Sequence, residues 1–269
     1  DAELAARSTL GADEVHRLWR YCADGGADNL ANLLGFARHL LDGTPEPDPP
    51  RALPRAGLFQ PGQAAASLAD LKAQWRDPDA PVAAIVFYRA LMQSAATEPV
   101  EALANALAAR GLNPLPVFVA SLKDAESAAV LASLFEEAAP AVVLNATAFA
   151  VSKAGVAHQP TPLDTPGAPV LQVIFSSSSQ EGWQSADQGL SIRDLAMHVV
   201  LPEIDGRLTP RAVSFKEQGE RDPLTQSAPV RFVPKADRID FVAELAARMA
   251  LLRTVPPAEK KLALILANY

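Results

Sequence analysis

Residues 82–152 constrain the fold of this chain most, because three apolar runs alternate there with two helix-like segments. The runs read VAAIVFYR, PLPVFVAS and AVVLNATAFAVS, and each ends in polar residues. Parallel strands that are buried on both faces have near-continuous apolar sequences of this kind. The intervening segments are long enough for right-handed crossovers. The pattern predicts an α/β fold with an open, mostly parallel sheet flanked by helices.

The polar residues at the strand ends are the first place to look for a site. Ligands of open parallel sheets bind beyond the carboxyl ends of the strands. We therefore expect Tyr88, Arg89, Ser121, Asn145 and Thr147 to lie along one edge of the sheet.

Two segments precede the sheet. Residues 1–43 predict a helical segment, with Asp28 as a helix N-cap and Gly43 as the stop signal. Residues 44–81 begin with a stretch dense in proline, which favours an extended connector, and continue into a short helix.

The α/β domain is predicted to span residues 82–256, and residues 257–269 read as the first strand of a following module. The other expected elements are a strand at 170–175, a helix at 191–195, a strand at 228–234, a helix at 237–252 and a strand at 262–267. The chain begins at Asp1 and ends in an apolar run, so we expect a piece of a longer polypeptide.

Composition and missing motifs exclude several kinds of function. The net charge is −7 with no basic block, which argues against nucleic acid as a partner. No apolar run approaches the ~20 residues of a membrane span. The single cysteine, Cys22, excludes an internal disulfide framework and fits a reducing, cytoplasmic location. The chain has no P-loop, no GxGxxG and no HExxH, and the serines at 176–179 lack the glycines of a nucleophile elbow.

Several segments, taken in order, resemble the large subunit of the aerobic cobalt chelatase, in the family of CobN and the magnesium-chelatase H subunit. They are GGADNLANLLGFARHLL, VAAIVFYR, ALAARGLNPLPVFVASLKD, VVLNATAFAVS, GAPVLQVIFSSSSQEGW, LSIRDLAMHVVLPEIDGRLTPRAVSF and LALILANY. The resemblance covers most of the chain, and LNATAFAVS and SLKD favour the cobalt branch.

This resemblance implies a reaction, the insertion of Co²⁺ as substrate into hydrogenobyrinic acid a,c-diamide during cobalamin biosynthesis. ATP and Mg²⁺ would act on AAA+ ATPase partner subunits, which agrees with the missing P-loop. The alternatives are a magnesium-chelatase-type subunit acting on protoporphyrin, a scaffold segment without a ligand, and a free-standing binding protein. An internal fragment is expected to be inactive alone.

The implied chemistry selects candidate residues by type. Cobalt needs an imidazole or a carboxylate, and the pyrrolic protons need a base. We assign His198 to the metal. We assign Glu203 and Asp205 to catalysis, because residues two apart in a strand point to the same side. The alternative is that Asp205 and Gly206 form a hairpin turn and His198 is a core or interface residue.

The tetrapyrrole side chains need hydrogen-bond donors and cations. The candidates for substrate binding are Tyr88, Arg89, Asn145, Thr147, Ser176 and Ser177. The alternative for the amide and hydroxyl groups is hydrogen bonding within their own loops. Arg89 can instead cap a helix or pair with Glu98.

Overall fold

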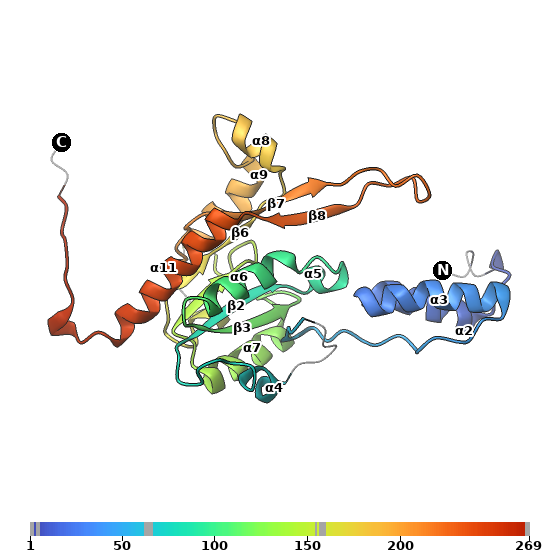
Figure 1. Ribbon diagram of the computed structural model, residues 1–269, viewed down its shortest axis with the longest axis horizontal. Helices are drawn as coiled ribbons and strands as arrows, with labels where there is room; N and C mark the ends of the chain where they lie inside the picture. Colours follow the sequence, from blue (N-terminus) through green and yellow to red (C-terminus); the bar gives the residue numbers. More distant parts are fainter. Residues whose placement is uncertain (1–2, 4–5, 62–66, 154, 156–159, 267–269) are drawn as a thin grey trace.

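The computed structural model describes residues 3, 6–61, 67–153, 155 and 160–266. It contains a five-stranded, mostly parallel sheet between helices, a smaller three-stranded sheet and two N-terminal helices (Figure 1). The predicted fold class is confirmed. No helix within these residues is long and apolar enough to cross a membrane.

The main sheet has the strand order β1-β3-β2-β4-β5. Its strands are β1 (Ala56–Leu58), β2 (Val82–Tyr88), β3 (Asn113–Val119), β4 (Val142–Asn145) and β5 (Val170–Gln172). Strands β2 to β5 run parallel to one another, so the predicted strand–helix unit is confirmed. Their carboxyl ends therefore lie at one edge of the sheet.

Strand β1 was not predicted, because it lies inside the proline-rich connector. It pairs antiparallel with the last part of β3, and the Phe59 N–H donates to Pro116 O at 2.9 Å. In a strand, the nitrogen and the carbonyl of one residue face the same side. The ring nitrogens of Pro114 and Pro116, which carry no hydrogen, therefore both face this edge. Prolines are tolerated there because β1 covers only the end of β3.

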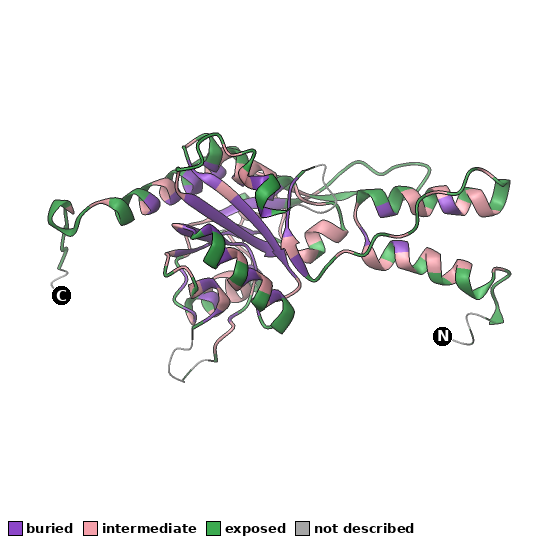
Figure 2. Ribbon diagram, turned by 90° about the horizontal axis from the view of Figure 1, so that it is seen from below, coloured by how far each residue is buried: buried purple, intermediate pink, exposed green. Residues whose placement is uncertain are grey.

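The two crossover helices lie on opposite faces of the sheet. The chain steps from β2 to β3 in one direction and returns past β2 to β4, so right-handed crossovers require this arrangement. Helix α6 (Glu98–Ala108) packs on Ile85 and Phe87, whereas α7 (Ala125–Ala138) packs on the side of Val86. Figure 2 shows the buried strands enclosed by helices whose outer faces are exposed.

Helix α11 (Ala236–Thr254) covers the same face as α6 and confirms the helix predicted at 237–252. The shorter helical elements are α4 (Leu68–Lys72), α5 (Arg89–Gln93), α8 (Gln180–Ser185), η1 (Pro162–Asp164) and η3 (Pro257–Glu259). Helix α4 is the short helix predicted in the connector, and Ser67 is its N-cap.

The strand predicted at 170–175 is divided between two sheets. Strand β5 ends at Gln172, the Val173 N–H donates to Asn145 O at 2.9 Å, and β6 (Ile174–Phe175) starts the second sheet. That sheet continues with β7 (Ala212–Gln218) and β8 (Val230–Pro234), which form an antiparallel pair. The predicted strand at 228–234 is thereby confirmed.

One continuous helical segment replaces the extended chain predicted before Gly206. It consists of α9 (Ile192–Leu195), a π-helical turn η2 (Ala196–Val200) and α10 (Leu201–Glu203). The prediction of a strand leading into a hairpin was wrong. Pro202 cannot donate a helical hydrogen bond, and the wider π turn before it, closed by Leu201 N–H to Ala196 O, lets the helix continue.

The N-terminal helices form a hairpin, α2 (Ala12–Asp24) and α3 (Ala27–Asp42), which projects from the α/β unit (Figure 1). The predicted helical segment is confirmed but is interrupted at Gly25 and Gly26. Gly43 adopts the left-handed conformation expected of a helix stop. The N-cap of α3 is Gly26, so the prediction of Asp28 as N-cap was wrong.

The strand predicted at 262–267 is not formed in its described part. Residues 260–266 have no regular secondary structure, and Leu262 and Ile265 are 94% and 90% exposed. A strand requires a partner for its backbone groups, and these residues pair with none of the described strands. Residue 267 lies outside the described residues.

Candidate functional site

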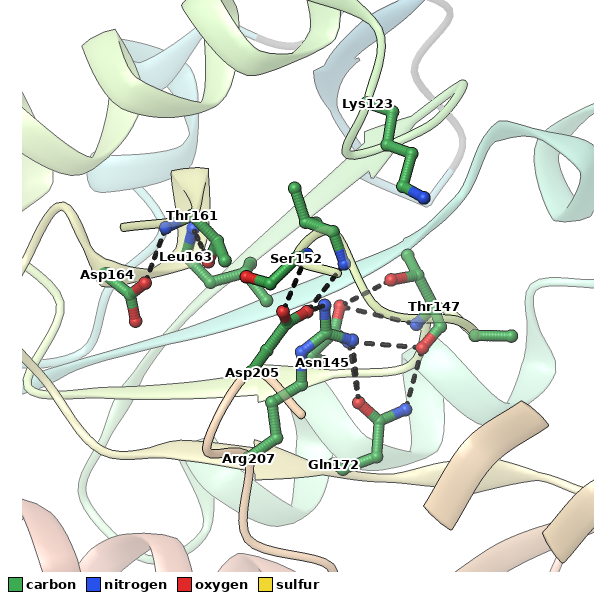
Figure 3. Close-up of polar contacts among 12 residues, drawn as sticks. Lys123, Asn145, Thr147, Ser152, Thr161, Leu163, Asp164, Gln172, Asp205 and Arg207 are labelled. Atoms are coloured by element: carbon green, nitrogen blue, oxygen red, sulfur yellow. Dashed lines mark hydrogen bonds and ion pairs between the residues drawn. The ribbon is translucent and has the colours of Figure 1, made fainter. Parts of the chain in front are cut away.

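The carboxyl edge of the parallel sheet holds a buried network of amide and hydroxyl groups (Figure 3). Thr147 Oγ1 donates to Asn145 Oδ1 at 2.9 Å, and Asn145 Nδ2 donates to Gln172 Oε1 at 2.8 Å. All three residues are 0% exposed. The predicted pair of Asn145 and Thr147 therefore lies at this edge, but each side chain bonds to its neighbours.

A buried ion pair completes this network. Arg207 Nη2 donates to Asp205 Oδ2 at 2.7 Å, and Nη1 donates to Gln172 Oε1 at 3.2 Å. Asp205 also accepts the N–H groups of Val151 and Ser152 at 2.7 and 2.9 Å. Burial alone would raise the pKa of Asp205, but these hydrogen bonds and the charge of Arg207 outweigh it and lower the pKa. Asp205 is thus held as a carboxylate that fixes the loop after β4.

Tyr88 closes the crevice between β2 and β4. Its hydroxyl donates to Ala148 O at 3.1 Å and accepts the Ala148 N–H at 3.0 Å. Burial raises the pKa of this phenol, so it remains protonated. Strand order reverses between β2 and β4, and folds of this type bind ligands at that point. In this chain Tyr88 and the loop after β4 occupy the crevice.

The Arg89 side chain bonds to the proline-rich connector. Its Nε and Nη2 atoms donate to Pro54 O and Leu53 O, both at 2.8 Å. The side chain therefore fastens the proline-rich connector to the start of α5. These bonds involve neither a helix cap nor Glu98.

A second cluster lies beyond β6, where Ser176 and Ser177 meet Asp194. Ser176 Oγ donates to Asp194 Oδ2 at 2.7 Å, and Ser177 Oγ donates to Asp194 Oδ1 at 2.8 Å. Asp194 is 1% exposed and lies in the first turn of α9. Sequence reasoning missed Asp194, although Ser191 three residues earlier forms an N-cap with it and was a usable signal.

His198 follows Asp194 by about one turn, within the π-helical turn. Its Nδ1 is buried and has no hydrogen-bond partner among the described residues. Burial lowers the pKa of His198, the charge of Asp194 raises it, and the charge of Arg193 lowers it further. The net direction is downward, so the imidazole is neutral at neutral pH and keeps a lone pair.

Glu203 and Asp205 do not converge as predicted. Glu203 is exposed at the end of α10, whereas Asp205 is buried in the turn that follows. The prediction failed because it assumed a strand, in which side chains two apart share a face. In the described part of the chain, no group of three or more histidine, cysteine or acidic residues is arranged to hold a metal ion.

Three cavities lined by described residues lie away from the carboxyl edge. The first, of about 990 Å³, borders the amino half of β3 and is lined by Phe59, Gln60, Trp75 and residues of α6. The second, of about 460 Å³, borders the start of β2 and the end of α7, and the third, of about 240 Å³, lies between the start of α3 and the α/β unit. The polar edge of the sheet and these cavities are thus separate features.

The fold and the polar edge define a class of protein, an α/β unit of the doubly wound type whose loop after β4 bonds to a π-containing helical segment. Within that class, the chain belongs to the CobN/Magnesium Chelatase family, whose model matches residues 19–269.

The chain is 46% identical over its whole length to the aerobic cobaltochelatase subunit CobN of a Sinorhizobium species, and 41% identical to that of Pseudomonas aeruginosa. It spans 22% and 21% of those relatives. It is 26% identical, over 74% of its length, to the magnesium-chelatase subunit ChlH of rice, of which it covers 14%. A solved catalytic subunit of cobaltochelatase from Mycobacterium tuberculosis matches 97% of this chain and 21% of its own, with a TM-score of 0.77 and 32% identity.

Proposed function

We propose that this chain is a segment of the tetrapyrrole-binding large subunit of an ATP-dependent cobalt chelatase. The complete subunit would insert Co²⁺ into hydrogenobyrinic acid a,c-diamide during cobalamin biosynthesis, in the cytoplasm. The observation that carries the proposal is the 46% identity, over the whole chain, to a cobaltochelatase subunit. The 26% identity to a magnesium-chelatase subunit covers less of the chain, so an action on protoporphyrin is not favoured.

His198 is the residue that we assign to the incoming cobalt ion. A metal ion binds the neutral imidazole, and burial keeps His198 in that form. Its Nδ1 is buried, which leaves Nε2 for the ion. Because the described residues offer no further cluster of ligands, His198 would hold cobalt together with groups from the remainder of the subunit.

Glu203 is the residue that we assign to the pyrrolic protons. It is exposed at the end of the same helical segment, so its carboxylate is available to a ring lying against that segment. Asp205 has no such freedom, because two backbone N–H groups and Arg207 occupy its carboxylate. We therefore assign Asp205 to the positioning of the loop after β4.

The substrate-binding candidates also divide into a residue that would contact the substrate and residues that would act indirectly. Ser177 is exposed and lies one residue from the buried Ser176. Its hydroxyl donates to Asp194, so it would serve a ring side chain as an acceptor. Tyr88, Arg89, Asn145 and Thr147 would act indirectly, by fixing the edge against which the substrate lies. AAA+ partner subunits would bind ATP and Mg²⁺, since the chain has no P-loop.

Cobalt insertion by a chimera tests the proposal. This chain replaces the matching segment of the Pseudomonas aeruginosa subunit, and the chimera is assayed with its partner subunits. We expect Co²⁺ insertion, a loss of about 10-fold or more for His198→Gln, and slower turnover for Glu203→Ala. Glu220 is an exposed carboxylate in the segment between β7 and β8. Glu220→Ala is the matched control and should leave the rate unchanged.

The second candidate function is a scaffold segment without a ligand. A tetrapyrrole-binding experiment distinguishes it from the proposed function. Its support is that most polar groups of the carboxyl edge bond to one another. Tetrapyrrole titrated into the 269-residue chain should quench its tryptophan fluorescence if the edge contacts the ring. A folded chimera that inserts cobalt equally well with and without His198 and Glu203 would refute their assigned roles and favour the scaffold.

A further inference from the structure

Phe149 is held in a backbone conformation that large side chains rarely adopt. It lies in the loop after β4, and its φ is +67°, in the left-handed region. Among the described residues, the other non-glycine residues with positive φ are Ala95, Ala139 and Gln226. Phe149 is therefore the one bulky apolar residue of that part of the chain in this conformation, which crowds its Cβ against the backbone. Strain of this kind persists only where the surrounding structure imposes it, and it is concentrated at functional sites.

Hydrogen bonds fix the loop on both sides of Phe149. Before it, the Tyr88 hydroxyl donates to Ala148 O at 3.1 Å and accepts the Ala148 N–H at 3.0 Å. After it, the carboxylate of Asp205 accepts the N–H groups of residues 151 and 152 (Figure 3). The neighbouring bonds therefore impose the conformation of Phe149, and the loop is rigid before any ligand arrives.

The ring of Phe149 has no structural partner that would explain this strain. The side chain is 50% exposed, whereas that of the next residue, Ala150, is 6% exposed. The ring stacks on no other aromatic ring and on no cation among the described residues. A half-exposed aromatic ring on a rigid loop offers an apolar face to a ligand that has a flat apolar face of its own.

The backbone of Phe149 is joined to the helical segment that carries the proposed metal residue. The Phe149 N–H donates to Met197 O at 2.9 Å, and His198 is the next residue in the π-helical turn. A metal ion enters a tetrapyrrole through a face of the macrocycle, so a side chain that delivers the ion has to approach that face. An apolar contact that holds the macrocycle would therefore lie close to His198, where the loop after β4 is fixed.

We propose that Phe149 binds the tetrapyrrole substrate by stacking its ring on a face of the conjugated macrocycle. The inference rests on the proposed function, because it takes a tetrapyrrole as the substrate. The fixed loop orients the phenyl ring in advance, so little conformational entropy is lost when the macrocycle binds.

Titration of hydrogenobyrinic acid a,c-diamide with the chimeric subunit, followed through the absorption of the macrocycle and without partner subunits, tests the proposal. Phe149→Leu keeps an apolar side chain but removes the aromatic ring, and it should raise the Kd by about 3-fold or more. Phe149→Gly should raise the Kd by about 10-fold or more, although glycine adopts the left-handed conformation without strain. Phe149→Tyr keeps the ring and should bind within about 2-fold of the unchanged chimera. Circular dichroism checks that each variant is folded.

Phe241 provides the matched control. Its side chain is 43% exposed, but it lies in the regular helix α11, and the guanidinium carbon of Arg211 lies over its ring at 3.4 Å from the centroid. Phe241→Leu should therefore leave the Kd unchanged. Cobalt insertion gives a second measurement, in which Phe149→Leu should raise the KM for the macrocycle with little change in kcat. Stacking acts on the bound substrate and the transition state alike, whereas partial unfolding would lower kcat.

Three outcomes would overturn the proposal. The first is an unchanged Kd for both Phe149→Leu and Phe149→Gly. The second is an equal loss of binding by Phe149→Tyr and Phe149→Leu, which would mean that Phe149 shapes the loop without contacting the macrocycle. The third is the absence of macrocycle binding by the folded chimera.

Cobalt insertion separates this inference from the proposed function. If the chimera inserts cobalt and Phe149→Leu has the same KM, only the stacking contact is refuted. If the chimera binds the macrocycle through Phe149 but does not insert cobalt, only the proposed reaction is refuted.

Discussion

The carboxylate of Asp205 and the guanidinium of Arg207 lie 2.7 Å apart, and both side chains are 1% exposed. A buried ion pair offsets the cost of desolvation only while both partners remain, because a single charge left in the interior has no compensation. We predict that Asp205→Ala lowers the free energy of unfolding by about 3–5 kcal/mol. Urea denaturation measures this loss, and the double change with Arg207→Met should cost less than the sum of the single changes.

An exposed pair provides the comparison. Arg248 and Glu244 also lie 2.7 Å apart, but their side chains are 75% and 49% exposed. Glu244→Ala should lower the free energy of unfolding by less than about 1 kcal/mol. Equal effects of Glu244→Ala and Asp205→Ala would show that burial does not govern the Asp205 pair.

Asp194 is predicted to make stability depend on acid pH. Burial acts to raise its pKa, but hydrogen bonds from Ser176 and Ser177 outweigh burial and hold the pKa below its usual value. A carboxyl whose folded-state pKa is lowered stabilises the fold above its unfolded pKa of about 3.9, and that contribution is lost as the pH falls. Asp194→Asn should therefore cost about 1–3 kcal/mol at pH 7 and lose less stability below about pH 5. The free energy of unfolding of both proteins is measured by urea denaturation from pH 3 to pH 7. The same dependence on pH in both proteins would contradict this prediction.

The His198 imidazole should titrate at low pH. Burial lowers its pKa, so NMR of the ring signals should give a midpoint below the usual ~6.5. Because the Asp194 charge raises this pKa, Asp194→Asn should move the midpoint lower still. A midpoint at or above that of a free imidazole would contradict the burial of His198.

The sequence predicted the strands of the parallel sheet because burial on both faces leaves long apolar runs. It did not predict β1 or the helical segment around His198. Strand β1 is three residues long and depends on pairing with Val117–Val119, which local sequence does not reveal. The run MHVVL contains β-branched residues, so its intrinsic preference favoured a strand, whereas in the fold it is helical and Met197 O accepts the Phe149 N–H from the loop after β4. In both segments, contacts with distant parts of the chain determined the secondary structure.

The candidate site was predicted in outline. Asn145 and Thr147 were expected together at the sheet edge and lie there, because the carboxyl ends of parallel strands share that edge. Gln172 and Arg207 were not among the predicted site residues, since nothing local marks an amide inside a strand or a buried arginine after a turn. Their place follows from the long-range packing of β5 against β4 and from the turn at Gly206, whose φ is 72°.

The joint between the hairpin and the α/β unit should be most sensitive at Gly25. Its φ is +67°, and an added Cβ would lie 2.6 Å from Gln93 O, a backbone atom that cannot easily move. Gly111, with φ +76° and nothing within 4 Å, is the matched control, because an alanine there meets only the backbone strain. We predict that Gly111→Ala costs about 1–2 kcal/mol, and that Gly25→Ala costs at least about 1 kcal/mol more, since it also overpacks the joint. Urea denaturation gives the difference, and faster amide exchange in residues 23–29 of Gly25→Ala would locate it. Equal costs would mean that the hairpin shifts freely against α5 and that this contact does not fix its position.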